Sequence, residues 1–138
     1  VNWAIRATGL EDFENRQLDS LSGGQRQRAW IAMALTQDTD VLLLDEPTTY
    51  LDLAHQIEIL ELLKDLNNKT KKTIVIVIHE LNHAARYAHN LVCMKNGNIY
   101  SQGEVDDVFN ENMLRDVFGV DSIVISDPIT QRPMCIPK

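Results

Sequence analysis

The sequence has 138 residues, of which 44% are hydrophobic and 24% charged, which is enough for one soluble domain with a hydrophobic core. Its formal net charge of -7 argues against binding to nucleic acid, which is itself a polyanion. The longest apolar runs, 29–35 and 74–78, are far shorter than the roughly 20 residues that cross a bilayer, and no signal-like segment begins the chain, so a cytosolic domain is expected.

The first element with a clear pattern is a helix over residues 25–36. This segment lacks glycine and proline and is rich in alanine, leucine, methionine, glutamine and arginine, which are strong helix formers. Ser22 precedes it and is a favourable N-cap residue. The stretch SGGQ is therefore predicted to be the start of a helix.

Two apolar segments predict strands on either side of a second helix. Residues 41–47 (VLLLDEP) and 73–79 (TIVIVIH) are short and strongly apolar. Such runs are typical of strands covered on both faces in a parallel sheet. Between them, leucine and isoleucine recur every three or four positions over 53–66, which predicts an amphipathic crossover helix that begins at Asp52.

Shorter elements are predicted in the rest of the chain. They are a helix over 81–89, a hairpin within 91–103, two short helices within 104–118 and a pair of short strands within 122–137. The hairpin prediction depends on Asn96-Gly97, a strong turn signal. Together with the preceding elements, the order strand, helix, strand, helix predicts an α/β fold.

Neither the cysteines nor the histidines predict a metal site. Cys93 and Cys135 lack ligand spacing and are predicted to be reduced and packed as small hydrophobic residues. An iron site could be suggested by His55, His83 and His89 together with Arg86. The spacing of the last three residues is instead typical of a solvated helix face, which is the preferred interpretation.

Three side chains with chemical potential follow the two predicted strands. Asp45 and Glu46 end the first strand, and His79 ends the second. The carboxyl ends of parallel strands meet at one edge of a sheet, where ligands bind, so these residues are expected on the same rim. An aspartate in this position suits Mg²⁺ beside nucleotide phosphates, and a neighbouring glutamate could orient or deprotonate a water molecule. A solvated strand end and a structural histidine are the simpler alternatives.

The turn formed by Ser22, Gly23, Gly24 and Gln25 also has two interpretations. It could be only an N-cap and a flexible entry into a helix. It could instead be an anion seat at the positive end of the helix, where glycine leaves the amides accessible. The chain contains no G-x-x-x-x-G-K-[ST] phosphate loop, so the magnesium and phosphate site would be incomplete.

Taken together, these segments resemble the ATP-binding subunits of ABC transporters. LSGGQRQR at 21–28 is similar to their signature motif, and VLLLDEP at 41–47 is similar to the Walker B strand with its catalytic glutamate. TTYLD at 48–52 resembles the D-loop, and His79 resembles the switch histidine. The chain from 48 to its end is most similar to ATPases that serve iron-siderophore importers, with those of haem and cobalamin importers next.

The resemblance implies a role for each motif residue. Ser22, Gly23, Gly24 and Gln25 would contact ATP held by a second subunit. Asp45 would hold Mg²⁺ through water, Glu46 would polarise the attacking water and His79 would reach the γ-phosphate in the same subunit. Asp52 would help to join the two sites of a head-to-tail dimer.

It also implies an organisation and a setting. The chain would be the C-terminal part of a P-loop NTPase domain with a largely parallel sheet, flanking helices and a small C-terminal strand pair. Residues 1–36 would end the helical subdomain, 37–103 would form the core and 104–138 the C-terminal elements. The cofactors would be ATP and Mg²⁺. The partners would be a second ATPase subunit, membrane permease subunits and, indirectly, an extracytoplasmic binding protein, at the cytoplasmic face of the membrane.

Two other functions remain open at this point. One is an ABC-type ATPase of DNA repair or translation, against which the acidic charge argues. The other is a non-catalytic half-domain that regulates a complete ATPase. For the transport ATPase that the resemblance implies, the isolated chain is expected to be inactive, because it lacks the phosphate loop pattern.

Overall fold

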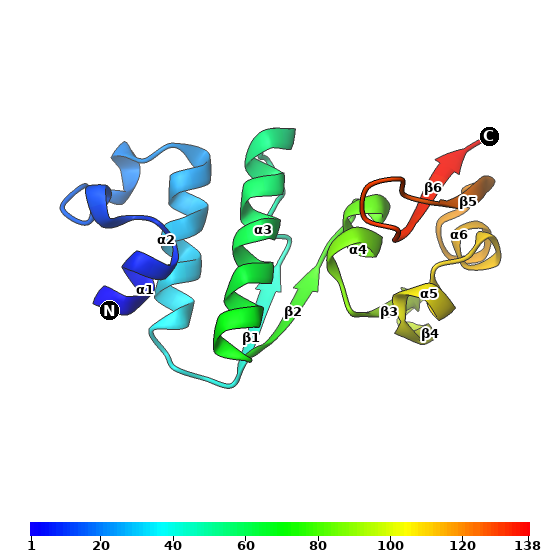
Figure 1. The fold of residues 1–138 in the computed structure, drawn as a ribbon, viewed down its shortest axis with the longest axis horizontal. Coiled ribbons are helices and arrows are strands. Elements are labelled where there is room, and N and C mark those ends of the chain that lie inside the picture. The colour runs from blue at the N-terminus through cyan, green and yellow to red at the C-terminus, as the bar shows by residue number, and fades with distance from the viewer. The chain divides into compact units, whose positions relative to one another are not determined.

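The computed structural model describes all residues from Val1 to Lys138, which divide into the units Val1–Ile78 and His79–Lys138. The first unit contains α1 (Asn2–Ala7), η1 (Glu11–Phe13), η2 (Leu18–Ser20), α2 (Gly23–Leu35), β1 (Val41–Asp45), α3 (Leu53–Thr70) and β2 (Thr73–Val77). The second contains α4 (Leu81–Tyr87), β3 (Asn90–Lys95), β4 (Asn98–Glu104), α5 (Val105–Val108), α6 (Glu111–Phe118), β5 (Ser122–Ser126) and β6 (Pro133–Pro137). The predicted α/β class is confirmed (Figure 1).

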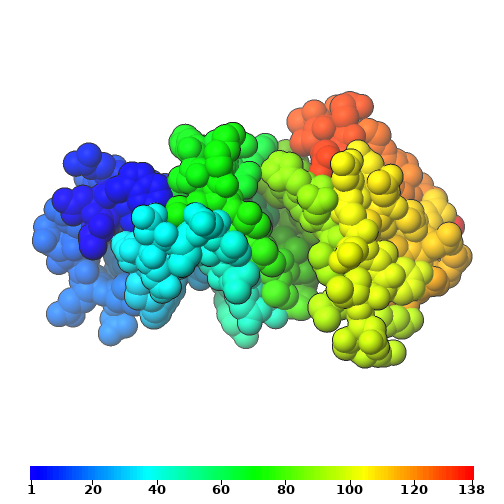
Figure 2. Space-filling view, turned by 90° about the horizontal axis from the view of Figure 1, so that it is seen from below, coloured from blue at the N-terminus to red at the C-terminus, as the bar shows by residue number.

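Strands β1 and β2 form a parallel pair joined by α3, as the sequence predicted. Their register places Val41 beside Thr73 and Asp45 beside Val77. Helices α2 and α3 pack with β1 around one core, whose buried members include Ile31, Leu35, Leu42, Ile59 and Leu63. The N-terminal helix α1 packs against α2, so the start of the chain lies on this helical layer (Figure 2).

Within residues 1–138, only one face of these two strands is covered. Leu43 is 72% exposed, and Val75 and Val77 are each about half exposed. Burial alternates along β2, so the second face of the strand pair is open to solvent. A continuous apolar run places apolar side chains on both faces, because successive side chains alternate between them, and residues 1–138 supply the cover for one of the two.

Helix α3 begins at the predicted residue and ends later than predicted. Asp52 is its N-cap, and the helix continues to Thr70 instead of stopping at residue 66. Lys71 follows with a φ of 59°, a left-handed conformation that ends many helices. The extra turn is polar, so the spacing of apolar residues could not predict it. A hydrogen bond of 2.9 Å from Asn67 Nδ2 to the carbonyl of Lys72 stabilises it.

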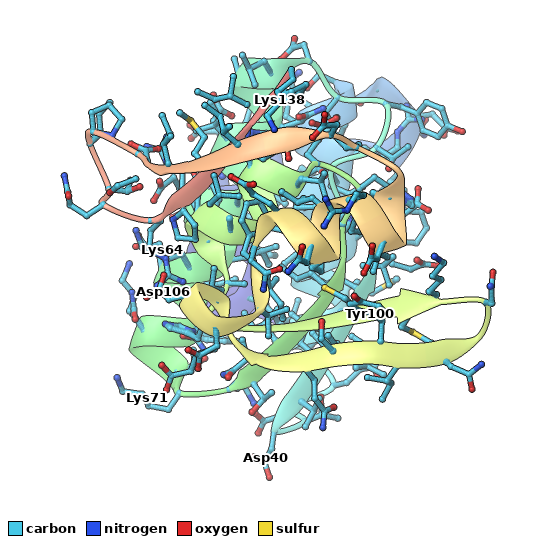
Figure 3. The ribbon with its side chains drawn as sticks, turned by 90° about the vertical axis from the view of Figure 1, so that its right-hand side faces the viewer. Asp40, Lys64, Lys71, Tyr100, Asp106 and Lys138 are labelled. Carbon is cyan, nitrogen blue, oxygen red and sulfur yellow. The ribbon has the colours of Figure 1, made fainter.

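The second unit contains two antiparallel hairpins around its own core. Strands β3 and β4 pair across the predicted turn, where Asn96 and Gly97 have positive φ values. Strands β5 and β6 form the predicted closing pair. Tyr100 of β4 donates a hydrogen bond of 2.7 Å to Asp116 of α6, which raises the pKa of the phenol (Figure 3).

Helix α4 is held by the segment around β6. The side chain of Asn82 exchanges two hydrogen bonds with the backbone of Cys135, at 2.8 and 3.2 Å. Arg132 donates to the carbonyls of Ala85 and Ala88, near the C-terminal end of the helix. The two bonds from Arg132 satisfy carbonyl groups that the end of the helix would otherwise leave unpaired.

The prediction of a solvated face over His83, Arg86 and His89 is only partly correct. Helix α4 ends at Tyr87, so His89 lies outside it. His83 is half-buried, its Nδ1 has no hydrogen-bond partner and its ring meets Tyr87 edge-on at 6.3 Å. Arg86 is exposed, with its Nη1 at 3.9 Å from Asp127.

Both cysteines are buried free thiols, as predicted. Burial raises the pKa of Cys93 and of Cys135. None of the helices has the length and apolar character needed to span a membrane.

Candidate functional site

The glycine turn, which consists of Ser22, Gly23, Gly24 and Gln25, is the start of the 13-residue helix α2. Ser22 is an exposed N-cap whose Oγ accepts a hydrogen bond from the Gln25 amide at 3.3 Å. Gln25 Oε1 accepts in return from the Ser22 amide at 3.0 Å. This reciprocal capping box satisfies two of the donors at the helix start and fixes the backbone entering α2.

The capping box leaves the amides of Gly23 and Gly24 as the remaining donors of the first turn. Gly23 is exposed, whereas Gly24 is buried. A helix N-terminus carries a partial positive charge, and exposed amides at this end favour an anion. Arg26 lies in the same turn, exposed, and donates to the carbonyl of Leu21 at 3.5 Å.

Asp45 and Glu46 lie together where β1 ends. The carboxylate of Asp45 is exposed and has no ion pair or hydrogen bond in the structure. The Glu46 amide donates to the carbonyl of Val77 at 3.1 Å, which extends the contact between β1 and β2 by one residue. The acidic pair is therefore at the carboxyl edge of the parallel strands, where ligands of such sheets bind.

A local turn sets the direction of Glu46. Its φ of 48° is in the left-handed region, which non-glycine residues adopt rarely and at a cost in strain. Thr49 holds it there, because its amide donates to the Glu46 carbonyl at 3.2 Å and its Oγ1 donates to Glu46 Oε2 at 3.0 Å. Sequence reasoning missed this role of Thr49, and its only signal was the spacing of three residues from the glutamate.

Asp52 caps helix α3 and contacts a histidine. Its Oδ1 accepts a hydrogen bond from the His55 amide at 3.0 Å and lies 2.8 Å from His55 Nδ1. The bond from the His55 amide and then the bond from its ring lower the pKa of Asp52. An ionised carboxylate can only accept hydrogen bonds, so Nδ1 of the imidazole carries the proton.

The first unit thus contains seven of the eight site residues that the sequence predicted, in two groups. One group is the acidic pair Asp45 and Glu46 at the end of β1. The other is the glycine turn together with Asp52, since Leu51 and His55 beside Asp52 contact Gly23 and Gly24. The eighth, His79, is exposed and begins the second unit, two residues after the Val77 that pairs with Asp45.

Known proteins match the chain along nearly its whole length. A family model described as ABC transporter matches residues 1–49, which include the glycine turn and the acidic pair. The probable siderophore transport system ATP-binding protein YusV of Bacillus subtilis is 56% identical over 99% of this chain and 50% of its own length. The iron(3+)-hydroxamate import ATP-binding protein FhuC of the same organism is 50% identical over 99% of this chain and 51% of its own length.

A solved structure agrees with these sequence matches. It is described as an inward-facing conformation of a metal-chelate type ABC transporter, and it superposes with a TM-score of 0.88 at 30% identity, covering 99% of this chain and 55% of its own. The chain spans about half the length of the curated relatives that it matches. The motifs, the fold and these likenesses agree: the chain is similar to ATP-binding proteins of ABC transporters over about half of their length and has the fold of their ATPase domains.

Proposed function

We propose that this chain supplies two half-sites of an ATP-hydrolysing transport subunit. The observation that carries the proposal is the glycine turn, in which Ser22 and Gly23 are exposed and the capping box leaves the amides of Gly23 and Gly24 to receive an anion. In the ABC family such a turn closes over the nucleotide of a second subunit. Ser22, Gly23, Gly24 and Gln25 would therefore bind the ATP of a partner in a head-to-tail dimer.

The acidic edge of β1 would act on the nucleotide of its own subunit. The exposed carboxylate of Asp45, which has no protein partner, offers the oxygen ligands that Mg²⁺ prefers. When bound to ATP, Mg²⁺ neutralises charge on the phosphates. Glu46, oriented by Thr49, would polarise the attacking water, and His79 would approach the γ-phosphate. Asp52 would connect the two half-sites across the dimer.

Import of an iron-siderophore compound is the transport function that the relatives support best. The relatives described above are named for siderophore transport and for import of iron(3+)-hydroxamate. These names favour import over a role in DNA repair or translation. We therefore infer that the subunit works with membrane permease subunits, and indirectly with an extracytoplasmic binding protein, as a peripheral protein at the cytoplasmic face of the membrane.

A hybrid subunit would test the ATPase role. In this hybrid, residues 1–138 replace the matching half of the Bacillus subtilis siderophore relative, so that a phosphate loop is present. We expect the hybrid to bind and hydrolyse ATP, whereas the 138-residue chain alone should show no turnover. Robust turnover by the chain alone, or none by the hybrid, would contradict the proposal.

The variant Glu46→Gln tests the acidic edge within the hybrid. Glutamine keeps the shape and an acceptor for Thr49 but cannot act as a base, so hydrolysis should slow by orders of magnitude while ATP still binds. Glu14→Gln makes the same chemical change at an exposed position away from the acidic edge and should leave both quantities unchanged. A Glu46→Gln hybrid that turns over ATP at the normal rate would remove the proposed base.

A further inference from the structure

His55 lies beneath the glycine turn. A β-carbon built on Gly24 would lie 2.6 Å from His55 Cδ2 and 3.3 Å from its Cγ, much closer than atoms in van der Waals contact approach. The imidazole ring therefore occupies the space that any side chain at position 24 would need. Gly24 is buried, and His55 lies beside it although the two residues are far apart in the sequence.

The need for glycine at position 24 comes from this contact and not from the backbone. Gly24 is within α2, and it is not among the glycines with positive φ. Alanine is a better helix former than glycine, so helix propensity alone would favour alanine there. At Gly23 a β-carbon would lie 3.5 Å from Leu51 Cδ2, which is ordinary contact. The two adjacent glycines are therefore under different constraints.

Asp52 holds the ring in place. Its carboxylate contacts both the amide and Nδ1 of His55, so the ring has one orientation relative to the start of α3. Leu51 and His55, on either side of Asp52, support Gly23 and Gly24 respectively. The segment 51–55 thus contacts the glycine turn at two consecutive residues.

We propose that His55 is a positioning residue for the proposed ATP-binding turn. Through its contact with Asp52, the imidazole ring fixes the first turn of α2 relative to residues 51–55. A displacement of Asp52 is then transmitted to the amides of Gly23 and Gly24, so the two elements that face a second subunit move together. This inference rests on the proposed function for its catalytic consequence, whereas the contact itself can be tested without ATP.

A double-mutant cycle in the 138-residue chain tests the contact. Gly24→Ala should lower the urea midpoint of unfolding, because the new methyl group displaces the ring from Asp52. In the His55→Ala background the same change should leave the midpoint unchanged or raise it, since the space is then free and alanine favours the helix. Gly23→Ala serves as the matched control and should show the same effect in both backgrounds. Additive effects of Gly24→Ala and His55→Ala would overturn the proposal.

Steady-state kinetics of the hybrid test the positioning role. His55→Ala should lower kcat at least tenfold while KM for ATP changes less than threefold, because the turn would still be present but misplaced. His55→Asn, which keeps a donor for Asp52, should recover part of kcat. Ile59→Val, a buried change on the same helix, reports the effect of reduced stability alone.

The outcomes separate the two proposals. A non-additive unfolding cycle together with a selective loss of kcat in His55→Ala supports the positioning role. A kcat for His55→Ala equal to that of Ile59→Val overturns this role and leaves the proposed function intact. A wild-type hybrid that binds no ATP and shows no turnover refutes the proposed function, and the positioning role with it.

Discussion

Substitutions at Ser22 can separate its role as a helix cap from its proposed role at a phosphate. In Ser22→Ala, the Gln25 amide loses the hydroxyl that accepts its hydrogen bond at 3.3 Å. Loss of a serine N-cap costs roughly 0.5–2 kcal/mol of stability, and the length of this bond places the expected loss toward the lower end. A loss of about 1 kcal/mol would change the folding equilibrium about fivefold.

Ser22→Asp preserves the cap and changes the charge. Aspartate is as good an N-cap as serine, and its negative charge is favourable at a helix N-terminus, so the unfolding free energy should change by less than about 0.5 kcal/mol. The same charge about 4 Å from a phosphate oxygen would be opposed by about 4 kcal/mol at an effective dielectric constant of 20. ATP turnover by the hybrid should therefore fall by roughly two to three orders of magnitude.

Two assays check these expectations. Urea unfolding of the chain, followed by circular dichroism, measures the cap, with Ser126→Ala as an exposed serine control in the second unit. The rate of ATP hydrolysis by the hybrid tests whether Ser22 lies beside a phosphate of ATP. Equal unfolding midpoints for Ser22→Ala and Ser126→Ala would refute the role of Ser22 as a cap. Normal ATP turnover by the Ser22→Asp hybrid would refute its proposed position beside a phosphate.

Two further predictions concern α3. Ile59→Ala should lower the unfolding free energy by about 2–5 kcal/mol in urea titrations, because Ile59 is 1% exposed in the core. Ile57→Ala, at a 39% exposed position, should lower it much less. Equal losses for the two variants would contradict the assigned core. The His55 contacts lower the pKa of Asp52 below 3.8, so its contribution is present above the unfolded-state pKa and is lost as pH falls through the folded-state pKa. Asp52→Asn keeps an N-cap but removes this titration, so its unfolding midpoint should fall less than that of the wild type as pH drops below about 4, and parallel pH profiles would contradict the assignment.

Much of the local structure could be predicted because its causes are local. Ser22 and Gln25 cap α2 across three positions, and Asp52 caps α3 in the same way. Asn96 and Gly97 adopt the positive φ values that make their pair a turn signal. Hydrogen bonds and backbone preferences that involve residues close in the chain can be predicted directly from the sequence.

The candidate site could be predicted only in part. The order of the motifs identified Asp45, Glu46 and the glycine turn, but not which of them contact each other. From the sequence, His55 suggests only a possible iron ligand, because its contact with Gly24 depends on how α3 packs beside α2. Thr49 was missed for a different reason, since its hydrogen bond requires the left-handed conformation of Glu46.

By itself, then, the sequence determined where the helices and strands begin, which residue types occupy the motifs and which family the chain resembles. The tertiary structure alone decided which face of the β1–β2 pair α2 and α3 cover, that Arg132 binds the carbonyls at the end of α4 and that an imidazole ring fills the space beside Gly24. These features join residues that are distant in the chain. Their contacts depend on how whole elements pack, and hydrophobic periodicity specifies which face of an element is apolar but not what will cover it.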